Sequence, residues 1–453
     1  MCSMNVKERI NEMTEAMLND LARLVKYNSV EGEAMPGMPF GEAPAGVLKE
    51  ALEIADSMGF RTNNLDNYCG YAETGAGEDI VAMAAHLDIV PAGEGSNTDP
   101  FELTREGDVV YGRGVSDDKG PVIAALYAMK LLQESGMPIN KRVRVIMGCN
   151  EETGSKCMAH YNEVEEPVTI GFTPDGEFPG IHGEKGMIKM TAYSKNTGII
   201  SMDGGFVSNA VCSRCRTIIP ESAVEMEKLT DALKDTDLKS FGITHKDGTF
   251  VIEAEGVAAH ASTPLLGINA AGCTMKALKE AGMKDDFVDY YNSHIGTECN
   301  GAGYGINMQD DYGELTMSNG IGKTENGVIS CTLDSRVPVT YTPEQIKEMV
   351  LPYLEDDKGY TEINSQCESL FYPVDSELVT ALYNAYVEVT GDTKTRPMVI
   401  GGGTYAKSIP GIIAFGNQFL GVDNHIHDAN ERMDINDFKL QVEIYLQALK
   451  NLL

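Results

Sequence analysis

The stretch Ile80-Val-Ala-Met-Ala-Ala-His86-Leu-Asp88 decides the fold. A short apolar run that ends in polar residues predicts a buried β-strand that carries a histidine at its C-terminal end. Val143–Met147 and Val168–Phe172 repeat this pattern and lead into Glu151-Glu152 and Asp175, respectively. Three strand ends therefore deliver histidine or carboxylate side chains.

Helical patterns alternate with these strands. Met13, Met17, Leu21 and Leu24 share one helical face, and Val47–Met58 has similar spacing. Pro121–Leu132 begins with a proline, which is favourable in the first turn of a helix. Strands that alternate with helices predict an α/β domain whose sheet is mainly parallel and flanked by helices. Open sheets of this kind bind ligands at the carboxyl ends of their strands.

The pattern changes at about residue 186. Met187–Tyr193, Thr249–Glu255 and Val328–Val337 alternate as half-buried strands do, and amphipathic helical stretches separate them. We therefore expect an inserted α+β domain over residues 187–371, within a first domain made of residues 1–186 and 372–453.

Charge and composition limit the location and the partners. Of 453 residues, 36 are Lys or Arg and 68 are Asp or Glu, a formal net charge of -32, which disfavours nucleic acid and anionic membranes as partners. The N-terminus lacks the apolar core of a signal peptide, and no apolar run is long enough to span a membrane. We expect a cytoplasmic protein. The lone pair Cys212-Ser-Arg-Cys215 favours ordinary thiols over a zinc or redox site.

The polar blocks together predict a metal centre. In His86-Leu-Asp88, positions i and i+2 share a strand face, so Asp88 is placed to orient His86. The glycine-rich block Tyr111–Pro121 supplies Asp117 and Asp118, and the loop from His425 to Glu431 supplies two more histidines. Imidazoles and carboxylates suit two Zn²⁺ or Mn²⁺ ions, which would lower the pKa of a bridging water.

The blocks HLDIVPAG, GRGVSDDKGP, NEETGS, FTPDGEFP and HDANE resemble the M20 metallopeptidase family in order and spacing over essentially the whole chain. The subgroup that is most similar is that of the PepV/Sapep-type bacterial dipeptidases. The resemblance implies that His86 and Asp175 bind one metal ion, that Glu152 and His427 bind the other, and that Asp117 bridges both. It favours His427 over His425, and Asp117 over Asp118.

The resemblance also implies the catalytic groups. Asp88 would orient His86, and Glu151 would be the general base that activates the bridging water and passes its proton to the leaving amine. His260, in the block Gly256–Pro264, would stabilise the oxyanion from the inserted domain. The remaining substrate contacts that the resemblance implies are Asn209, Arg336, Gly401 and Gly402.

In the PepV-like subgroup the inserted lid is a doubled ferredoxin-like domain and the enzyme is monomeric, so the length of this insert favours a monomer over a homodimer. The expected function is hydrolysis of small unblocked dipeptides with two divalent ions, Zn²⁺ ahead of Mn²⁺ on intrinsic affinity. The alternative enzyme is an N-acyl amino acid deacylase with the same metal centre. A metal-binding protein without turnover is disfavoured because the base Glu151 is present.

Overall fold

The computed structural model describes residues 5–453. The chain divides into two compact units. Unit 1 holds the described residues up to Gly183 together with Tyr372–Met398 and Gly403–Leu453, and unit 2 holds Glu184–Phe371 and Val399–Gly402. The short segment 399–402 groups with unit 2 because the Lys185 N–H donates to the Ile400 carbonyl at 2.9 Å.

Unit 1 alternates strands and helices along the chain. Its elements are α1 (Val6–Val25), α2 (Glu42–Ser57), β1 (Arg61–Leu65), β2 (Cys69–Gly75), β3 (Ile80–His86), β4 (Thr104–Glu106), β5 (Val109–Tyr111), α3 (Lys119–Glu134), β6 (Arg142–Gly148), α4 (Lys156–Val164), β7 (Ile170–Thr173), α9 (Glu377–Thr390), β21 (Ile412–Ala414), β22 (Arg432–Asp434) and α10 (Ile435–Leu452). Strands β8 (Ile181–Glu184), β19 (Leu370–Phe371) and β20 (Met398–Ile400) lie where the chain passes between the units.

The main sheet of unit 1 is parallel at its centre and antiparallel at its sides. Its order is β1-β2-β6-β3-β7-β21-β8-β19, and β20 pairs with β8. The neighbours β6, β3, β7 and β21 run parallel, whereas β1 with β2 and β2 with β6 are antiparallel. Every residue of β3 is buried. The expected α/β domain with a mainly parallel, helix-flanked sheet is confirmed, with antiparallel strands at its margins.

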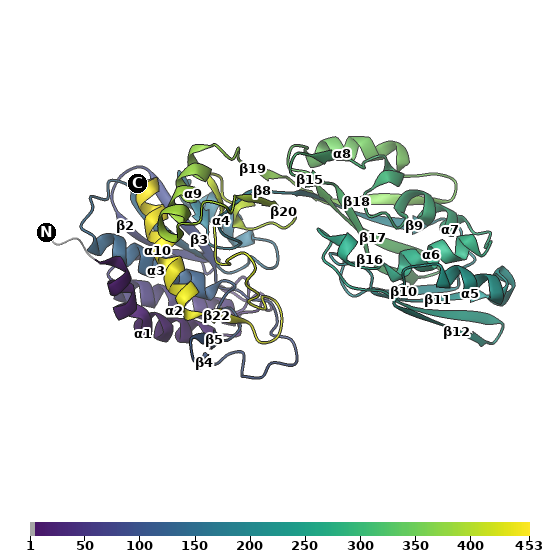
Figure 1. The fold of residues 1–453 in the computed structure, drawn as a ribbon, viewed down its shortest axis with the longest axis horizontal. Coiled ribbons are helices and arrows are strands. Elements are labelled where there is room, and N and C mark those ends of the chain that lie inside the picture. The colour runs from purple at the N-terminus through teal and green to yellow at the C-terminus, as the bar shows by residue number, and fades with distance from the viewer. Residues whose placement is uncertain (1–4) are drawn as a thin grey trace. The chain divides into compact units, whose positions relative to one another are not determined.

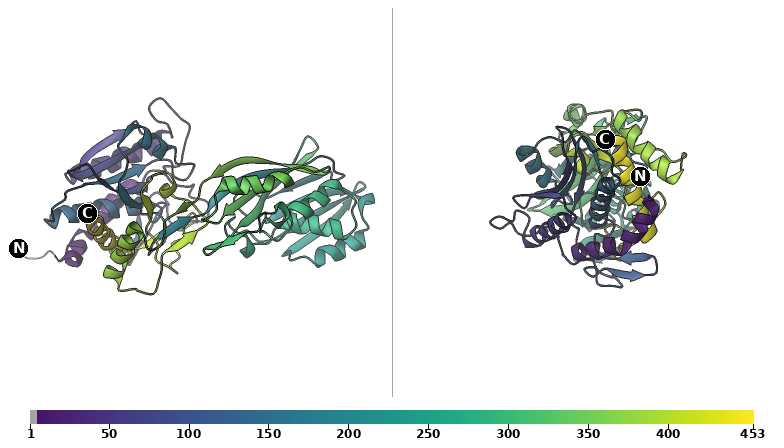
Figure 2. Two further views of the ribbon diagram at one scale, coloured as in Figure 1. Left: turned by 90° about the horizontal axis from the view of Figure 1, so that it is seen from above. Right: turned by 90° about the vertical axis from the view of Figure 1, so that its left-hand side faces the viewer.

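Local sequence explains where the helices of unit 1 start. Asn5 caps α1 by accepting the Glu8 N–H at 3.3 Å, and Asp434 caps α10 by accepting the Asn436 N–H at 2.7 Å. Pro121 lies in the first turn of α3, where a missing N–H costs nothing. Helices α1 and α10, from the two ends of the chain, lie side by side (Figures 1 and 2).

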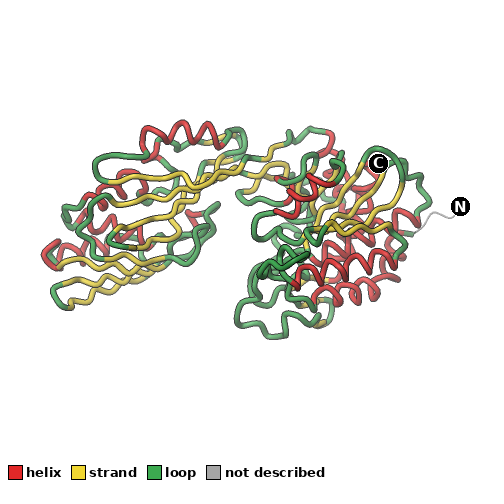
Figure 3. The backbone as a smooth tube through the Cα atoms, turned by 180° about the vertical axis from the view of Figure 1, so that it is seen from behind, coloured by secondary structure: helices red, strands yellow, loops and turns green. Residues whose placement is uncertain are grey.

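Unit 2 is built on one antiparallel sheet of order β12-β13-β11-β10-β16-β17-β9-β18. Figure 3 shows the strands of both units in yellow. Its larger elements are β9 (Gly186–Ser194), β10 (Ser201–Gly204), β11 (Arg214–Pro220), α5 (Met226–Lys234), β12 (Ser240–Lys246), β13 (Thr249–Glu255), α6 (Ala270–Glu280), α7 (Asp286–Tyr290), β16 (Thr316–Glu325), β17 (Val328–Val337), α8 (Pro343–Val350) and β18 (Gly359–Cys367). The short hairpin β14 (Gln309–Asp310) and β15 (Gly313–Glu314) stands apart from this sheet.

The sheet of unit 2 consists of two similar halves. Strands β12, β13, β11 and β10 form one half, in which α5 connects β11 to β12 and α6 follows β13, and β16, β17, β9 and β18 form the other, with α7 and α8. Strand β9 alternates buried and partly exposed residues, as expected of a sheet with one covered face. One apolar core runs beneath both halves. This is the α+β architecture that the sequence pattern predicts, in the doubled form that the family resemblance implies.

Candidate metal centre

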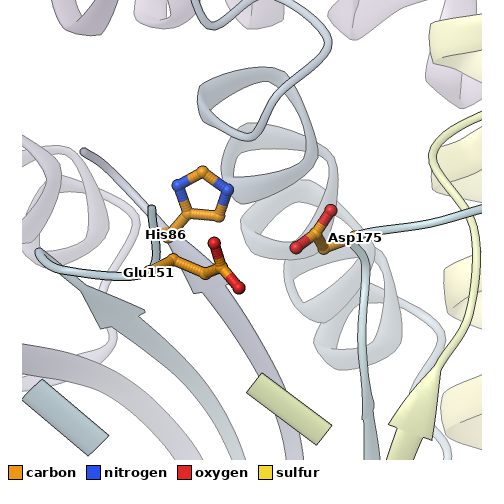
Figure 4. Close-up of side chains that lie close together, drawn as sticks. All are labelled: His86, Glu151 and Asp175. Atoms are coloured by element: carbon orange, nitrogen blue, oxygen red, sulfur yellow. The ribbon is translucent and has the colours of Figure 1, made fainter. Parts of the chain in front are cut away.

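Three neighbouring parallel strands deliver polar side chains to one edge of the sheet. His86 is the last residue of β3 and pairs in register with Gly148, the last residue of β6. Glu151 follows β6 by a short turn, and Asp175 follows β7. The ligand atoms of His86, Glu151 and Asp175 lie within 4.8 Å of one another, and their side chains face a common centre (Figure 4). Strand ends that are far apart in the sequence thus form one cluster.

Asp117 lies between two imidazoles. Its Oδ1 is 2.9 Å from Nε2 of His86, and its Oδ2 is 2.8 Å from Nε2 of His427. The same His427 nitrogen is 3.3 Å from Oε1 of Glu152. His86, Asp117 and Glu152 also offer ligand atoms within 4.8 Å of one another. A carboxylate with one oxygen toward each of two histidines has the geometry expected of a group that bridges two cations.

The charges in this cluster are strongly perturbed. Burial and the neighbouring carboxylate of Asp175 raise the pKa of Glu151 well above its usual value. Hydrogen bonds to Asp117 and Glu152 raise the pKa of His427 to about 10. Burial disfavours the charge of Asp117, but hydrogen bonds from His427 and His86 outweigh it and hold the pKa of that carboxyl below its usual value. The histidines therefore supply the positive charge that the carboxylates require.

The donor set fits divalent metal ions. Oδ1 of Asp88 is buried and accepts no hydrogen bond within the described residues, and the buried Oε1 of Glu152 has only a long contact of 3.3 Å with Nε2 of His427, so both oxygens keep unused lone pairs. Imidazole nitrogens and carboxylate oxygens are the ligands that Zn²⁺ and Mn²⁺ accept. A cation here would meet the demand for positive charge without protonated histidines.

Asp88 contacts His86 through its backbone. Nδ1 of His86 lies 2.9 Å from the carbonyl oxygen of Asp88 and 3.6 Å from its carboxylate Oδ1. The carboxylate instead accepts the Glu152 N–H at 3.0 Å through Oδ2. We predicted that the Asp88 side chain orients the His86 imidazole, but the backbone carbonyl of Asp88 makes this contact. The Asp88 side chain binds the turn that bears Glu151 and Glu152.

Asp118 and His425 lie near expected ligands in the sequence and have different contacts from them. Asp118 accepts the backbone N–H of His86 at 3.0 Å, and the Asp117–Asp118 peptide bond is cis. Nε2 of His425 is 3.6 Å from Asp423 Oδ2, and its contacts do not include the two carboxylates that His427 meets. The structure therefore brings His427 and Asp117 together, as expected.

The expected substrate contacts of unit 2 also gather in one place. The backbone carbonyl of Asn209 accepts the Ala261 N–H at 2.9 Å, and Ala210 and His260 form an isolated antiparallel β-bridge. Arg336 donates from Nη1 to the Gly401 carbonyl at 2.6 Å. Gly401 joins the two pairs, because a Cβ added there would lie 2.2 Å from Cβ of Ser262, so four segments that are distant in the sequence meet within unit 2. Gly402 has the most open surroundings, because apart from its chain neighbours only the Ile400 side chain, at 3.5 Å, would lie within 4 Å of a Cβ added at this position.

Arg336 is more enclosed than a substrate contact on the surface. It is 4% exposed, and Asp334 accepts from its Nε at 2.6 Å and from its Nη2 at 3.2 Å. With the bond to Gly401, these contacts use three of the five guanidinium N–H groups. The pairing with Asp334 fixes the plane of the guanidinium from within β17.

Sequence reasoning missed several residues around these groups. Arg113 and Glu431 form a buried ion pair beside Asp117, and Ser262 contacts His260. Arg113 and Glu431 do lie in two of the quoted blocks, but nothing in the spacing reports that they meet. Cys212 and Cys215 are buried free thiols, and neither belongs to a metal-binding group among the described residues.

Comparison with known proteins identifies the family. Residues 82–451, which include His86 and His427, match peptidase family M20/M25/M40. The chain belongs to this family. It is therefore a peptidase, a hydrolase of peptide bonds, and the family implies divalent metal ions at the centre described above.

Relatives of this M20 chain match it from end to end. The Bacillus subtilis protein named "Putative dipeptidase YtjP" is 32% identical, covering 99% of this chain and 100% of the relative. A protein of the same description from Staphylococcus haemolyticus is 30% identical, covering 98% and 99%.

Solved structures share the fold of this M20 chain. Human carnosine dipeptidase 1 gives a TM-score of 0.60 at 16% identity, covering 98% of both chains. An M20 family metallo-carboxypeptidase from Sulfolobus solfataricus gives 0.56 at 17% identity, covering 96% of this chain and 99% of that one. At this identity the likeness concerns the fold alone. Among the described helices, none is both long and apolar enough to cross a membrane.

Proposed function

We propose that the protein is a metallodipeptidase that hydrolyses small unblocked dipeptides. The observation that carries the proposal is the Asp117 carboxylate, held between the imidazoles of His86 and His427 at the carboxyl edge of the sheet. Relatives that span the whole chain and carry the description of dipeptidases support the choice of substrate. Unit 1 would be the catalytic domain and unit 2 the lid.

Five side chains would hold two metal ions. His86 and Asp175 would bind the first, Glu152 and His427 the second, and Asp117 both. Bound there, divalent ions supply Lewis acidity that polarises the peptide carbonyl and lowers the pKa of water. Zn²⁺ is the ion we favour over Mn²⁺ on intrinsic affinity for this set of nitrogen and oxygen ligands.

Glu151 would be the general base. Its carboxylate lies in the same cluster as His86 and Asp175, and burial beside Asp175 raises its pKa. A carboxyl group with a raised pKa accepts a proton from water more readily at neutral pH and can then return it to the leaving amine. Asp88 supports this role because its carboxylate holds the Glu151–Glu152 turn through the Glu152 N–H.

His260 would donate a hydrogen bond to the oxyanion. The backbone N–H of Ser262 donates to Nδ1 of His260 at 3.2 Å, and the Ser262 hydroxyl lies 2.7 Å from the same nitrogen. An Nδ1 atom that accepts a hydrogen bond carries no proton, so the neutral ring carries it on Nε2. The donor that the role requires, a ring N–H, would then be on Nε2.

Arg336 and the Gly401–Gly402 backbone would bind the C-terminal carboxylate of the dipeptide, and Asn209 would be a further substrate contact. Arg336 keeps two N–H groups beyond its contacts with Asp334 and Gly401. A guanidinium whose plane is already fixed loses little side-chain entropy when it binds a carboxylate.

A comparison of three substrates tests the proposal. Metal-loaded protein is given an unmodified dipeptide, the same dipeptide with an N-acetyl group, and an N-acetyl amino acid, with chelator-treated protein as the control. We expect cleavage of the free dipeptide only, and loss of cleavage with chelator. Cleavage of the N-acetyl amino acid in place of the dipeptide would replace dipeptidase with deacylase activity.

The state of the protein is part of the same proposal. The two similar halves of the unit 2 sheet favour a monomer, which light scattering would check against the chain mass of 49.1 kDa. The cysteines of the described chain are free thiols, which suits a reducing compartment such as the cytoplasm.

A further inference from the structure

Arg113 and Glu431 form a buried ion pair beside the metal centre. Nη1 of Arg113 lies 2.6 Å from Oε2 of Glu431, and the two side chains are 3% and 1% exposed. They are 318 residues apart in the sequence. A buried ion pair is weak evidence of a stabilising role, because the cost of removing both charges from water offsets much of their attraction. The position of this pair calls for a different explanation.

Glu431 binds the backbone of the turn that carries Asp117. Its Oε2 accepts the Gly114 N–H at 3.0 Å, and its Oε1 accepts the N–H groups of Ser116 at 2.9 Å and of Asp117 at 3.0 Å. One carboxylate therefore receives three backbone hydrogen bonds in addition to the bond from Arg113. These contacts fix the backbone from which the Asp117 side chain extends.

Arg113 binds two other loops of the centre. Its Nη2 donates to the carbonyl of Asp428 at 3.0 Å, and Asp428 directly follows His427. The same nitrogen lies 3.2 Å from the carbonyl of Ala92 and 3.4 Å from that of Pro91, in the loop that continues from His86 and Asp88. The pair thus contacts each of the three loops that bear His86, Asp117 and His427.

We propose that Arg113 and Glu431 are positioning residues that set the distance between Asp117 and His427 before any metal ion binds. The inference rests on the proposed metal centre and extends it. A rigid arrangement of ligands spares the ion the cost of ordering three separate loops. Partners that hold metal ligands in place typically contribute 10- to 100-fold to metal affinity.

Glu431→Gln is the informative substitution. Glutamine has nearly the same shape, but one of its two ends is an NH₂ group, a donor that would face backbone N–H groups or Arg113. The matched control is Glu73→Gln. Glu73 is also paired with a buried arginine of unit 1, since its Oε2 lies 2.8 Å from Nη2 of Arg144, but it contacts none of the proposed ligands through the hydrogen bonds described.

The experiment measures Mn²⁺ and Zn²⁺ binding to metal-free protein by titration calorimetry, with circular dichroism to check folding. We expect Glu431→Gln to weaken binding of at least one ion by about 10- to 100-fold, while Glu73→Gln binds as the wild type does. Wild-type affinity in Glu431→Gln, or an equal loss in Glu73→Gln, would overturn the inference.

Arg113→Lys keeps the test decisive if Glu431→Gln does not fold. Lysine retains the charge beside Glu431 but loses the fork that contacts Asp428, Ala92 and Pro91 together. We expect weaker metal binding in this variant, and unchanged affinity would overturn the inference. Because the readout is binding, a protein that binds metal but cleaves no dipeptide would refute only the proposed function, whereas a wild-type protein that binds no divalent ion would refute both.

Discussion

Nε2 of His427 lies 2.8 Å from Oδ2 of Asp117, although the two residues come from the first and last sequence segments of unit 1. The other oxygen of Asp117 faces His86 at 2.9 Å. If Asp117 bridges two ions, the loss of either histidine should remove one ion, and the loss of Asp117 should affect both.

We therefore expect His427→Ala to bind one divalent ion per chain and Asp117→Asn to bind neither tightly. Mass spectrometric metal analysis after gel filtration, at a fixed protein concentration, gives the stoichiometry directly. His425→Ala is the control, because that histidine contacts Asp423 and should leave both ions bound. Two ions retained in His427→Ala would remove this histidine from the metal centre.

The adjacent residues Glu151 and Glu152 should have different functions, Glu151 as the general base and Glu152 as a metal ligand. Glu151 shares a cluster with His86 and Asp175, and Glu152 shares one with His86 and Asp117. We expect Glu151→Gln to keep both ions and to lower kcat by roughly 10²- to 10⁴-fold, the usual contribution of a general base. Glu152→Gln should lose metal as well as activity.

The two readouts, metal content and kcat, must be taken on the same samples. A Glu151→Gln variant that loses an ion would show that Glu151 is a ligand, an arrangement its distance to His86 and Asp175 permits. A Glu151→Gln variant with near-normal kcat and full metal content would remove the residue from the reaction altogether.

The sequence predicted the strand ends of the centre because hydrophobic patterning and burial coincide there. The apolar run Ile80–Ala85 ends at His86, and β3 occupies these residues. Parallel strands bring their carboxyl ends to one edge, so His86, Glu151 and Asp175 could be grouped before any coordinates were known. Asp117 and His427 come from loops and needed the family resemblance, because no periodicity sets the position of a loop.

Contacts that act across long separations escaped prediction for the same reason. Glu431 forms an ion pair with Arg113, and its carboxylate oxygens also accept hydrogen bonds from backbone N–H groups. Every residue other than proline carries such an N–H group, so the sequence does not show which ones Glu431 binds. Asp88 shows a subtler limit. Its spacing from His86 predicted a contact with the imidazole ring. Whether the carboxylate or the backbone carbonyl of Asp88 makes that contact depends on a backbone turn that the sequence does not specify.

Ser262 should control how well His260 acts. The Ser262 N–H and hydroxyl both meet Nδ1 of His260, and Gly401 packs so closely on Ser262 that a Cβ at position 401 would lie 2.2 Å from the Ser262 Cβ. We expect His260→Ala to lower kcat by roughly 10²- to 10³-fold, as for other oxyanion donors. Ser262→Ala and Gly401→Ala should cause smaller losses of kcat.

Nitrogen NMR of labelled histidine provides an independent readout for this prediction. Near neutral pH the His260 ring should show a protonated Nε2 and an unprotonated Nδ1. Thr263→Ala, at the neighbouring exposed side chain, should change neither the spectrum nor kcat. A neutral ring with its proton on Nδ1 would contradict the proposed donor role of His260.

The ion pair of Glu73 and Arg144 should make the stability of unit 1 depend on pH. Burial opposes the charge of Glu73, but hydrogen bonds from Arg144 and Arg61 outweigh it and lower the pKa of that carboxyl. A carboxyl whose pKa is lower in the folded state stabilises the fold above its unfolded pKa of about 4.3. This contribution is lost as the pH falls from there through the folded pKa.

We therefore expect Glu73→Gln to lower the free energy of unfolding at pH 7 by about 1.5–3 kcal/mol, the usual value of a hydrogen bond to a charged group. Urea denaturation of both proteins between pH 7 and pH 3 measures the difference. The gap between wild type and variant should narrow as the pH falls below about 4.3, because the unfolded wild-type chain then takes up a proton at Glu73 while the folded carboxyl, whose pKa is lower, is still charged. A gap that stays constant over this range would show that Glu73 contributes through its shape and packing, because its charge would then make no difference to stability.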